Sequence, residues 1–241
     1  MDYGLQLFSV RDFTANDLEG TLAKVAEMGY KTVEFAGYFG HSGADIRRML
    51  DENGLKAIGT HSGADGLRPE NIQESIAFHR EIGCENYVIP GHDLSTAAKI
   101  DEFVEIVNRA QPVLEAAGMK LHYHNHSHEF FPNNDGLIIH TELEKRTDMM
   151  FEIDTYWAFN AGLDPVETLE RLKNRISLIH LKDGFKGGIG KSLGQGEAPV
   201  KAVLAKAVEL GLGIIVESEG LDPDGISESR RCIEFLKEQN I

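Results

Sequence analysis

The feature that most constrains the fold of this 241-residue chain is an eightfold alternation of short apolar stretches with longer amphipathic stretches. Short apolar runs bounded by turn residues predict β-strands, and apolar residues that recur every three to four positions predict helices. The predicted strands cover residues 3–9, 32–37, 56–61, 86–91, a histidine-rich stretch from residue 120, 149–154, 176–183 and 213–220. The predicted helices cover residues 17–28, 42–53, 69–82, 95–117, 140–146, 166–174, 199–210 and 227–238.

Eight strand-helix units of about 30 residues each match the (β/α)8 TIM barrel, which usually has about 250 residues. A doubly wound open sheet is less consistent with the sequence, because SVRDFTAND follows the first strand and lacks the glycines of a dinucleotide-binding turn. No Pro- or Ser-rich linker interrupts the pattern, so a single domain over residues 1–241 is expected. Pro112 predicts an irregularity in the longest helix.

The histidine-rich stretch KLHYHNHSHEFF, residues 120–131, places His122, His124, His126 and His128 at every second position. Alternate residues of a strand point to the same face, so these imidazoles share one face as far as the strand continues. Metal binding and proton transfer are the functions that histidine most often serves near neutral pH. A solvated strand is the competing interpretation of this stretch alone.

Many titratable residues, including two of these histidines, fall at the carboxyl ends of the predicted strands. They are Glu34, His61, His124, His126, Glu152, Asp154, His180, Lys182, Asp183, Glu217 and Glu219. In a barrel these ends converge, and buried charges without partners are costly. Strands five to eight thus offer imidazole, carboxylate, imidazole and carboxylate to one point, which predicts a catalytic divalent ion such as Mn, Co, Zn or Mg.

Composition excludes several classes of protein. The formal net charge of −15 and the pI near 5.1 disfavour a nucleic-acid partner, which is bound largely through Lys and Arg. No apolar run approaches the length of a membrane span and the N-terminus lacks a signal pattern, so a cytoplasmic protein without membrane attachment is expected. Cys84 and Cys232 form no CxxC pair and are expected to be inert core thiols.

The loop GFKGGIGKSLGQGEAP, residues 184–199, resembles a phosphate-binding P-loop only superficially. The Walker spacing requires a glycine five residues before Gly190, and that residue is Phe185. A mobile lid or a phosphate site built with Lys186 and Lys191 remains an interpretation of this loop, since barrels often bind phosphate after strands seven and eight. A neutral sugar is equally consistent, because no arginine cluster accompanies the lysines.

A family resemblance rests on seven segments that occur in order along nearly the whole chain. They are GLQLFSVRD, TVEFAG, YHNHSHEF, EIDTYWAFNAG, IHLKD, LGQGEAPV and IIVESEG. In this order they resemble the xylose-isomerase-like barrel superfamily, the sugar phosphate isomerase/epimerase group. The resemblance implies a divalent metal held by one side chain from each of strands five to eight, which in the epimerase branch are Glu, Asp, His and Glu.

Asp154, His180 and Glu217 match the last three of these implied ligands, whereas His124 stands where the epimerase branch has Glu. The branch uses its two glutamates as the acid/base pair, so the replacement leaves Glu217 as the one carboxylate base at the metal. The partner in proton transfer is then expected to be His126, with Glu129 as the alternative. Some dehydratases of the superfamily resemble this chain in having a His two positions after the strand-five ligand.

The expected function is a metal-dependent isomerase or epimerase that removes a proton next to the carbonyl of a sugar or cyclitol and forms an enediolate. Lys182 is expected to stabilise the developing oxyanion and Trp157 to cover an apolar sugar face. Elimination from the same intermediate makes a dehydratase or lyase the near alternative. A nuclease-like metalloenzyme of the apurinic-site type and a non-catalytic sugar-binding barrel are the alternatives from other classes, and a homo-oligomer is left open.

The remaining polar residues are expected either to contact substrate or to have structural roles. Glu34 and His61 either contact substrate or serve the structure, Glu34 as a paired buried carboxylate. Glu152, two residues before Asp154, is expected to support an imidazole ligand. The other histidines are expected to be solvated; they are His41, His79, His92 and His140.

Overall fold

The computed structural model describes residues 1–239 and contains a closed barrel of parallel strands. Around the barrel the strands follow the order β1-β10-β7-β6-β5-β4-β3-β2, and every neighbouring pair is parallel. Their bounds are β1 Gly4–Gln6, β2 Thr32–Phe35, β3 Lys56–His61, β4 Asn86–Ile89, β5 Lys120–His124, β6 Met150–Asp154, β7 Ile176–Leu181 and β10 Gly213–Val216. The predicted (β/α)8 TIM barrel is confirmed.

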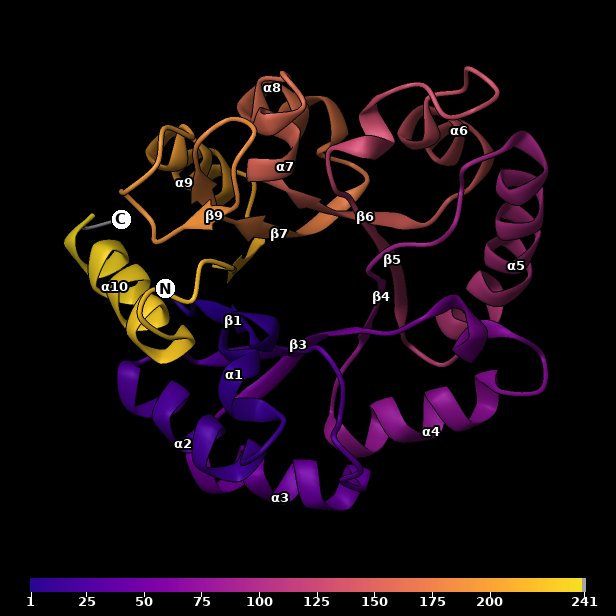
Figure 1. The fold of residues 1–241 in the computed structure, drawn as a ribbon. Helices are drawn as coiled ribbons and strands as arrows, with labels where there is room; N and C mark the ends of the chain where they lie inside the picture. The colour runs from indigo at the N-terminus through magenta and orange to yellow at the C-terminus, as the bar shows by residue number, and fades with distance from the viewer. Residues whose placement is uncertain (240–241) are drawn as a thin grey trace.

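Helices surround the strands on the outside of the barrel (Figure 1). The α-helices are α1 Arg11–Thr14, α2 Leu18–Met28, α3 Gly43–Asn53, α4 Ile72–Ile82, α5 Ala97–Ala116, α6 Ile139–Arg146, α7 Thr155–Asn160, α8 Pro165–Leu172, α9 Val200–Glu209 and α10 Gly225–Glu238. Short 3-10 helices are η1 Leu7–Val10, η2 Ala64–Leu67 and η3 His128–Phe130. None of the helices within residues 1–239 is long and apolar enough to cross a membrane.

Several helix ends lie where the sequence predicts them, because the chain supplies capping residues there. The Asp17 side chain accepts the N–H of Gly20 at the start of α2, and Ser42 forms a capping box at the start of α3. Gly29 and Gly54 end these helices with φ of 111° and 62°, in the left-handed region that glycine adopts without strain.

Four local features differ from the sequence-based expectation. The first strand ends at Gln6, whose side-chain oxygen accepts the N–H of Phe8 at 3.0 Å and turns the chain into η1. Helix α5 continues through Pro112, where an irregularity was expected, as one helix from Ala97 to Ala116. Helix α7 and the two-stranded hairpin β8 Asp183–Gly184 with β9 Gly190–Lys191 were not predicted. In α7 the capping group is Asp154, whose carboxylate accepts the N–H of Trp157 at 2.8 Å.

Inside the barrel, strand register separates an apolar end from a polar end. Directly paired residues of neighbouring strands point to the same face, and His122 pairs with both Val88 and Met150, at the apolar level. Val88, Leu178 and Ile215 form a small apolar cluster with Ile58, separate from the main core between strands and helices. Higher along the strands the pairs become polar, with His124 beside Glu152 and Asp154 beside His180.

Candidate metal centre

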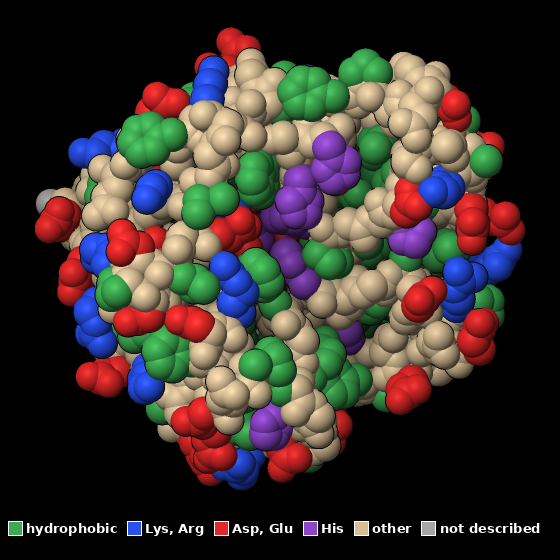
Figure 2. Space-filling view, in the orientation of Figure 1, with side chains coloured by type: hydrophobic (Ala, Val, Ile, Leu, Met, Phe, Trp, Pro, Cys, Tyr) green, Lys and Arg blue, Asp and Glu red, His purple; other side chains and the backbone are tan. Residues whose placement is uncertain are grey.

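The polar end of the barrel opens into a hollow at the centre of one face, where histidine side chains gather (Figure 2). The hollow is a cavity of about 330 Å³. It is lined by Phe8, Ala36, His61, Pro90, His124, His126, Glu217 and Glu219. Four of the predicted site residues, from β3, the end of β5 and the segment after β10, therefore share one cavity.

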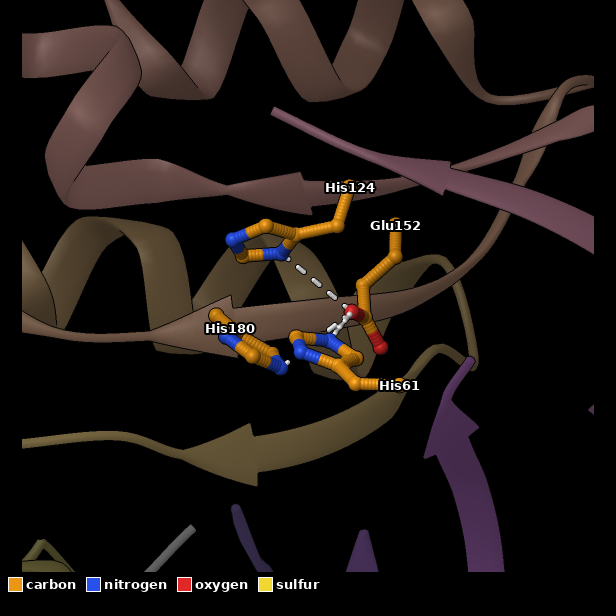
Figure 3. A group of neighbouring side chains, drawn as sticks. All are labelled: His61, His124, Glu152 and His180. Atoms are coloured by element: carbon orange, nitrogen blue, oxygen red, sulfur yellow. Dashed lines mark hydrogen bonds and ion pairs between the residues drawn. The ribbon is translucent and has the colours of Figure 1, made fainter. Parts of the chain in front are cut away.

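Below the cavity lies a group that we call the deep layer, made of Glu34, His61, His124, Glu152 and His180. Its centre is the Oε2 atom of Glu152, which lies 3.0 Å from His61 Nε2, 3.3 Å from His124 Nδ1 and 3.2 Å from His180 Nε2 (Figure 3). The side chains of Glu152 and His180 are fully buried, and that of His61 is 11% exposed. Glu152 thus contacts three imidazoles, and its expected support of an imidazole ligand stays a prediction.

Glu34 completes the deep layer from β2. Its Oε2 atom lies 2.7 Å from His180 Nε2 and 3.3 Å from His61 Nε2, and it accepts the Nε2–H of Gln6 at 2.8 Å. Gly59 makes room for this carboxylate, because a Cβ at residue 59 would lie 2.3 Å from Glu34 Oε1. Gln6 and Gly59 are supporting residues that sequence reasoning missed.

Burial and mutual contacts divide the charge within the deep layer. Burial raises the pKa of Glu152 to about 7, and the neighbouring Glu34 charge adds to the shift. Burial opposes protonation of His180, but Glu152 and Glu217 outweigh it and raise the pKa of that imidazole well above its usual value. Burial and the adjacent imidazoles lower the pKa of His124 well below its usual value, so its ring is neutral, as a metal ligand must be.

Above the deep layer lies a second group, the mouth group, made of Asp154, Lys182, Glu217 and Glu219. The Lys182 ammonium lies 2.6 Å from Glu219 Oε1, 3.3 Å from Glu217 Oε2 and 3.8 Å from Asp154 Oδ2. Burial alone would lower the pKa of Lys182, but Glu217 and Asp154 raise it. The same ammonium lies 4.6 Å from the centroid of the Trp157 ring, a cation–π distance.

The pKa values of the two carboxylates that the resemblance implies as metal ligands shift in opposite directions. Burial raises the pKa of Asp154 to about 6, although Lys182 opposes the shift. Burial also acts to raise the pKa of Glu217, but Lys182 and His180 lower it well below its usual value. Glu217 is therefore ionised at neutral pH.

Two overlapping groups of side chains bring metal-ligating atoms together. One is His124, Asp154, His180 and Glu217, and the other is His61, His124, Glu152 and His180; within each group the ligand atoms lie within 4.8 Å of one another. The first is the ligand set that the sequence predicts, and it fits a divalent ion: its donors are nitrogen and oxygen, all four residues are buried, and Asp154 Oδ2 has no hydrogen-bond partner within residues 1–239.

His126 and Glu129 take different positions although they are three residues apart. The His126 side chain is 39% exposed and its residue lines the cavity, whereas Glu129 is fully buried. Glu129 Oε2 accepts the backbone N–H of His126 at 2.8 Å, and Glu129 Oε1 accepts the hydroxyl of Tyr123 at 3.2 Å. Burial acts to lower the pKa of His126, but Glu129 raises it above the usual value.

Other predicted residues have structural partners. His122 is buried and bonds to Ser177 Oγ at 2.8 Å, below the deep layer. The expectation that His79 and His140 are solvated is wrong, since both are 2% exposed. His79 bonds to Thr60 at 2.6 Å, and His140 stacks on two phenylalanine rings. Cys84 and Cys232 are buried free thiols, as predicted.

The glycine-rich loop after β7 is organised by Asp183 rather than by lysines. The Asp183 carboxylate accepts four backbone N–H groups, from Gly184 and Gly194 at 2.8 Å, Gly196 at 3.0 Å and Ala198 at 3.2 Å. Gly196 has no room for a side chain, because a Cβ there would lie 2.3 Å from the Asp183 carboxylate. The loop therefore folds around one anion of the protein itself.

Comparison with known proteins gives a family match over most of the chain. A family model described as xylose isomerase-like TIM barrel matches residues 22–239. The chain is also 24% identical over 186 residues to an inosose dehydratase of Geobacillus kaustophilus, a match that covers 67% of this chain and 60% of the relative. The chain thus spans less than two thirds of the length of this curated relative.

Two similar solved structures come from Parabacteroides distasonis, and both are sugar phosphate isomerase/epimerase proteins by name. One is 25% identical with a TM-score of 0.83 and covers 98% of each chain. The other is 28% identical with a TM-score of 0.78 and covers 98% of this chain and 93% of its own. The similarity to these structures therefore extends over the whole barrel.

Proposed function

Because the chain belongs to the xylose isomerase-like TIM barrel family, we propose that it is a divalent-metal-dependent isomerase or epimerase of a sugar or cyclitol. The observation that carries this proposal is the pairing of an ionised carboxylate, Glu217, with a partly exposed imidazole, His126, on the wall of one cavity. A base and an acid that face one cavity can remove a proton from a bound substrate and return it elsewhere.

The metal would be held by His124, Asp154, His180 and Glu217. When bound, a Mn, Co, Zn or Mg ion would supply Lewis acidity that polarises a carbonyl oxygen of the substrate and acidifies the adjacent C–H. Glu217 lies just after β10, at the cavity wall, where its carboxylate can accept that proton.

His126 is proposed as the proton donor that completes the reaction. Glu129 raises the pKa of the His126 imidazole and accepts the backbone N–H of the same residue, so it would hold this segment in place and favour the protonated ring. The Lys182 ammonium, beside Glu217, would stabilise the negative charge that develops on the substrate oxygen of the enediolate. Protonation at the neighbouring carbon gives isomerisation, and protonation on the opposite face gives epimerisation.

Substrate contacts are proposed for His61 and Trp157. His61 lines the cavity from β3, and Trp157 lies beside Lys182 with its ring 6.0 Å from that of His126. The indole Nε1 is buried and has no hydrogen-bond partner in the described part of the chain, so it is free to donate to a hydroxyl oxygen. Glu34, fully buried beneath His61, would act on the substrate through that imidazole.

Elimination is the second candidate reaction, for a dehydratase or lyase of a keto-sugar. It is favoured by the unequal acid and base, since a cationic imidazole can protonate a leaving hydroxyl more readily than a second carboxylate can. The curated relative named inosose dehydratase supports the same reaction class. Both reactions begin with the same proton removal.

Solvent deuterium exchange tests the proposal for both reactions at once. We expect the Mn-loaded protein in D2O to label one carbon of at least one member of a panel of ketoses, cyclitols and keto-glycosides. At saturating Mn²⁺, Glu217→Gln should lower the exchange rate by about 10²–10⁴-fold while circular dichroism shows an unchanged fold. Glu209→Gln, at the end of α9 that precedes β10 on the far side of the barrel, is the matched control. Full exchange by Glu217→Gln contradicts the role of Glu217, and absence of label across the panel contradicts the proposed function.

A further inference from the structure

We propose that the deep layer is a second binding site for a divalent ion of the zinc class, with His61, His124, Glu152 and His180 as ligands. The site lies below the position that the mouth carboxylates would hold, and it is separate from it in two of its four ligands. This inference does not depend on the proposed reaction, because it concerns binding alone.

The ligand atoms of the deep layer are spaced closely enough to surround one ion. Four ligands at the zinc bond lengths of about 2.0–2.2 Å form a tetrahedron whose edges are about 3.3–3.6 Å long. The three edges that meet at Glu152 Oε2 are 3.0 Å to His61, 3.3 Å to His124 and 3.2 Å to His180. Figure 3 shows the three rings arranged around this one oxygen. Hydrogen bonding alone requires no such convergence of three imidazoles.

Unpartnered buried atoms carry the second step. His124 Nδ1 lies 3.3 Å from Glu152 Oε2 but forms no hydrogen bond with it or with any other described residue. The outer oxygens Glu152 Oε1 and Glu34 Oε1 are also buried without a hydrogen-bond partner in residues 1–239. Buried polar atoms are rarely left unsatisfied, and a ligated ion would satisfy His124 Nδ1 directly.

Charge carries the third step. Glu34 and Glu152 are fully buried, and the ion pairs that they form within residues 1–239 involve only histidines. A divalent ion bound here would place two positive charges beside two buried carboxylates, and the imidazoles would bind it in their neutral form. Glu34 Oε2, which lies 2.7 Å from His180 Nε2 and 3.3 Å from His61 Nε2, would lie beside the ion and contribute its charge.

Ion class follows from the ligand set. Three imidazoles and one carboxylate in a closed, buried layer suit Zn²⁺ or Co²⁺, whereas Mg²⁺ prefers oxygen ligands and retained waters. The ion has a path, since His61 and His124 both line the cavity. His180 faces the deep layer through Nε2 and Glu217 through Nδ1, so an ion below takes a ring that an ion at the mouth would also need.

Cobalt binding to the full-length, chelator-stripped protein tests the site without any substrate. Tetrahedral Co²⁺ absorbs visible light more strongly than six-coordinate Co²⁺, and Zn²⁺ can be titrated against it in competition. The deep variants are His61→Gln and Glu152→Gln, and the matched mouth variants are Asp154→Asn and Glu217→Gln. Circular dichroism and thermal unfolding of the metal-free proteins check that each variant folds.

The expected result is an intense visible spectrum in the wild-type protein and a loss of Co²⁺ affinity by about 100-fold or more in both deep variants, because a direct ligand is worth at least as much as an outer partner. The mouth variants should keep the intense spectrum of the deep site, even where they lose an ion that Asp154 and Glu217 would hold. Loss of the intense spectrum in the mouth variants but not in the deep variants would overturn the proposal, and so would a weak six-coordinate spectrum in the wild type. Neither result bears on proton exchange by a Mn-loaded protein, which is measured separately.

Discussion

The mouth group and the deep layer bury carboxylates at neighbouring heights of one barrel, but they neutralise them differently. At the mouth, one lysine lies within 4 Å of Asp154, Glu217 and Glu219. In the deep layer, histidines are the recorded ion-pair partners of Glu34 and Glu152 within residues 1–239. The mouth carboxylates raise the pKa of Lys182, whereas in the deep layer the pKa of His180 is raised and that of His124 is lowered. The mouth carboxylates thus share one lasting cation, whereas the deep carboxylates face imidazoles whose pKa values shift in opposite directions.

Lys182→Met should have the largest effect on stability, because it leaves three carboxylates of the mouth without their cation. We expect the free energy of unfolding of the metal-free protein at pH 7 to fall by about 3–5 kcal/mol, as for other buried ion pairs that lose one partner. Urea titration measures the change. Lys186→Met, at an exposed lysine of the following loop, is the control and should change little.

Adding Mn²⁺ to Lys182→Met tests whether a bound ion can replace the lost positive charge. An ion held by Asp154 and Glu217 replaces part of the lost positive charge, so it should stabilise the variant more than the wild type. Equal stability of Lys182→Met and Lys186→Met would show that the lysine does not neutralise the mouth.

Asp183 is a third kind of buried carboxylate, because its hydrogen-bond partners among the described residues are four backbone N–H groups. Asp183→Asn replaces one acceptor oxygen by an NH2 group that faces N–H donors. We expect a loss of about 2–3 kcal/mol in urea titration, the range for hydrogen bonds to a charged group. Asp148→Asn, on the surface, is the control. A loss below that of a typical surface change would mean that the loop holds its fold without this anion.

The smallest expected effect on stability concerns His79, a buried imidazole whose hydrogen-bond partners among residues 1–239 are a hydroxyl and a carbonyl rather than a carboxylate. Burial lowers its pKa, and its ring bonds to Thr60 and to the carbonyl of Ser75. The unfolded chain takes up a proton near pH 6.5 while the folded ring resists it, so stability is lost as the pH falls through that value. The wild type should therefore lose more stability than His79→Gln between pH 7.5 and 5, as measured by thermal unfolding at several pH values. A steeper loss in the variant would contradict the neutral state of His79.

The eight strands and most helix ends could be predicted because they depend on local pattern and capping. The same is true of His124, since alternation within β5 fixes its face. The height at which residues of different strands meet could not be predicted, because register shifts occur at Val33/Glu34 in β2 and at Phe151/Glu152 in β6. These shifts set the level of both deep carboxylates. The alternation of residues along a strand predicts which face a side chain points to, but not its height along the barrel axis.

The burial of His79 had a signal that was available in the sequence. In α4 it follows Ile72 and Ile76 at helical spacing and precedes Ile82, so it falls on the apolar stripe. Helix α7 had a weaker signal, since Asp154 is both a strand residue and an N-cap. A residue that serves two roles is hard to assign from sequence because each role has its own pattern.

The two faces of the His180 ring, Nε2 toward Glu152 and Nδ1 toward Glu217, make its tautomer a reporter of the whole centre. An ion bound at Nε2 would fix the ring proton on Nδ1, from which it would hydrogen-bond to Glu217. An ion bound at Nδ1 would fix the proton on Nε2, from which it would hydrogen-bond to Glu34. The nitrogen chemical shifts of one side chain would therefore distinguish an ion in the deep layer from an ion at the mouth.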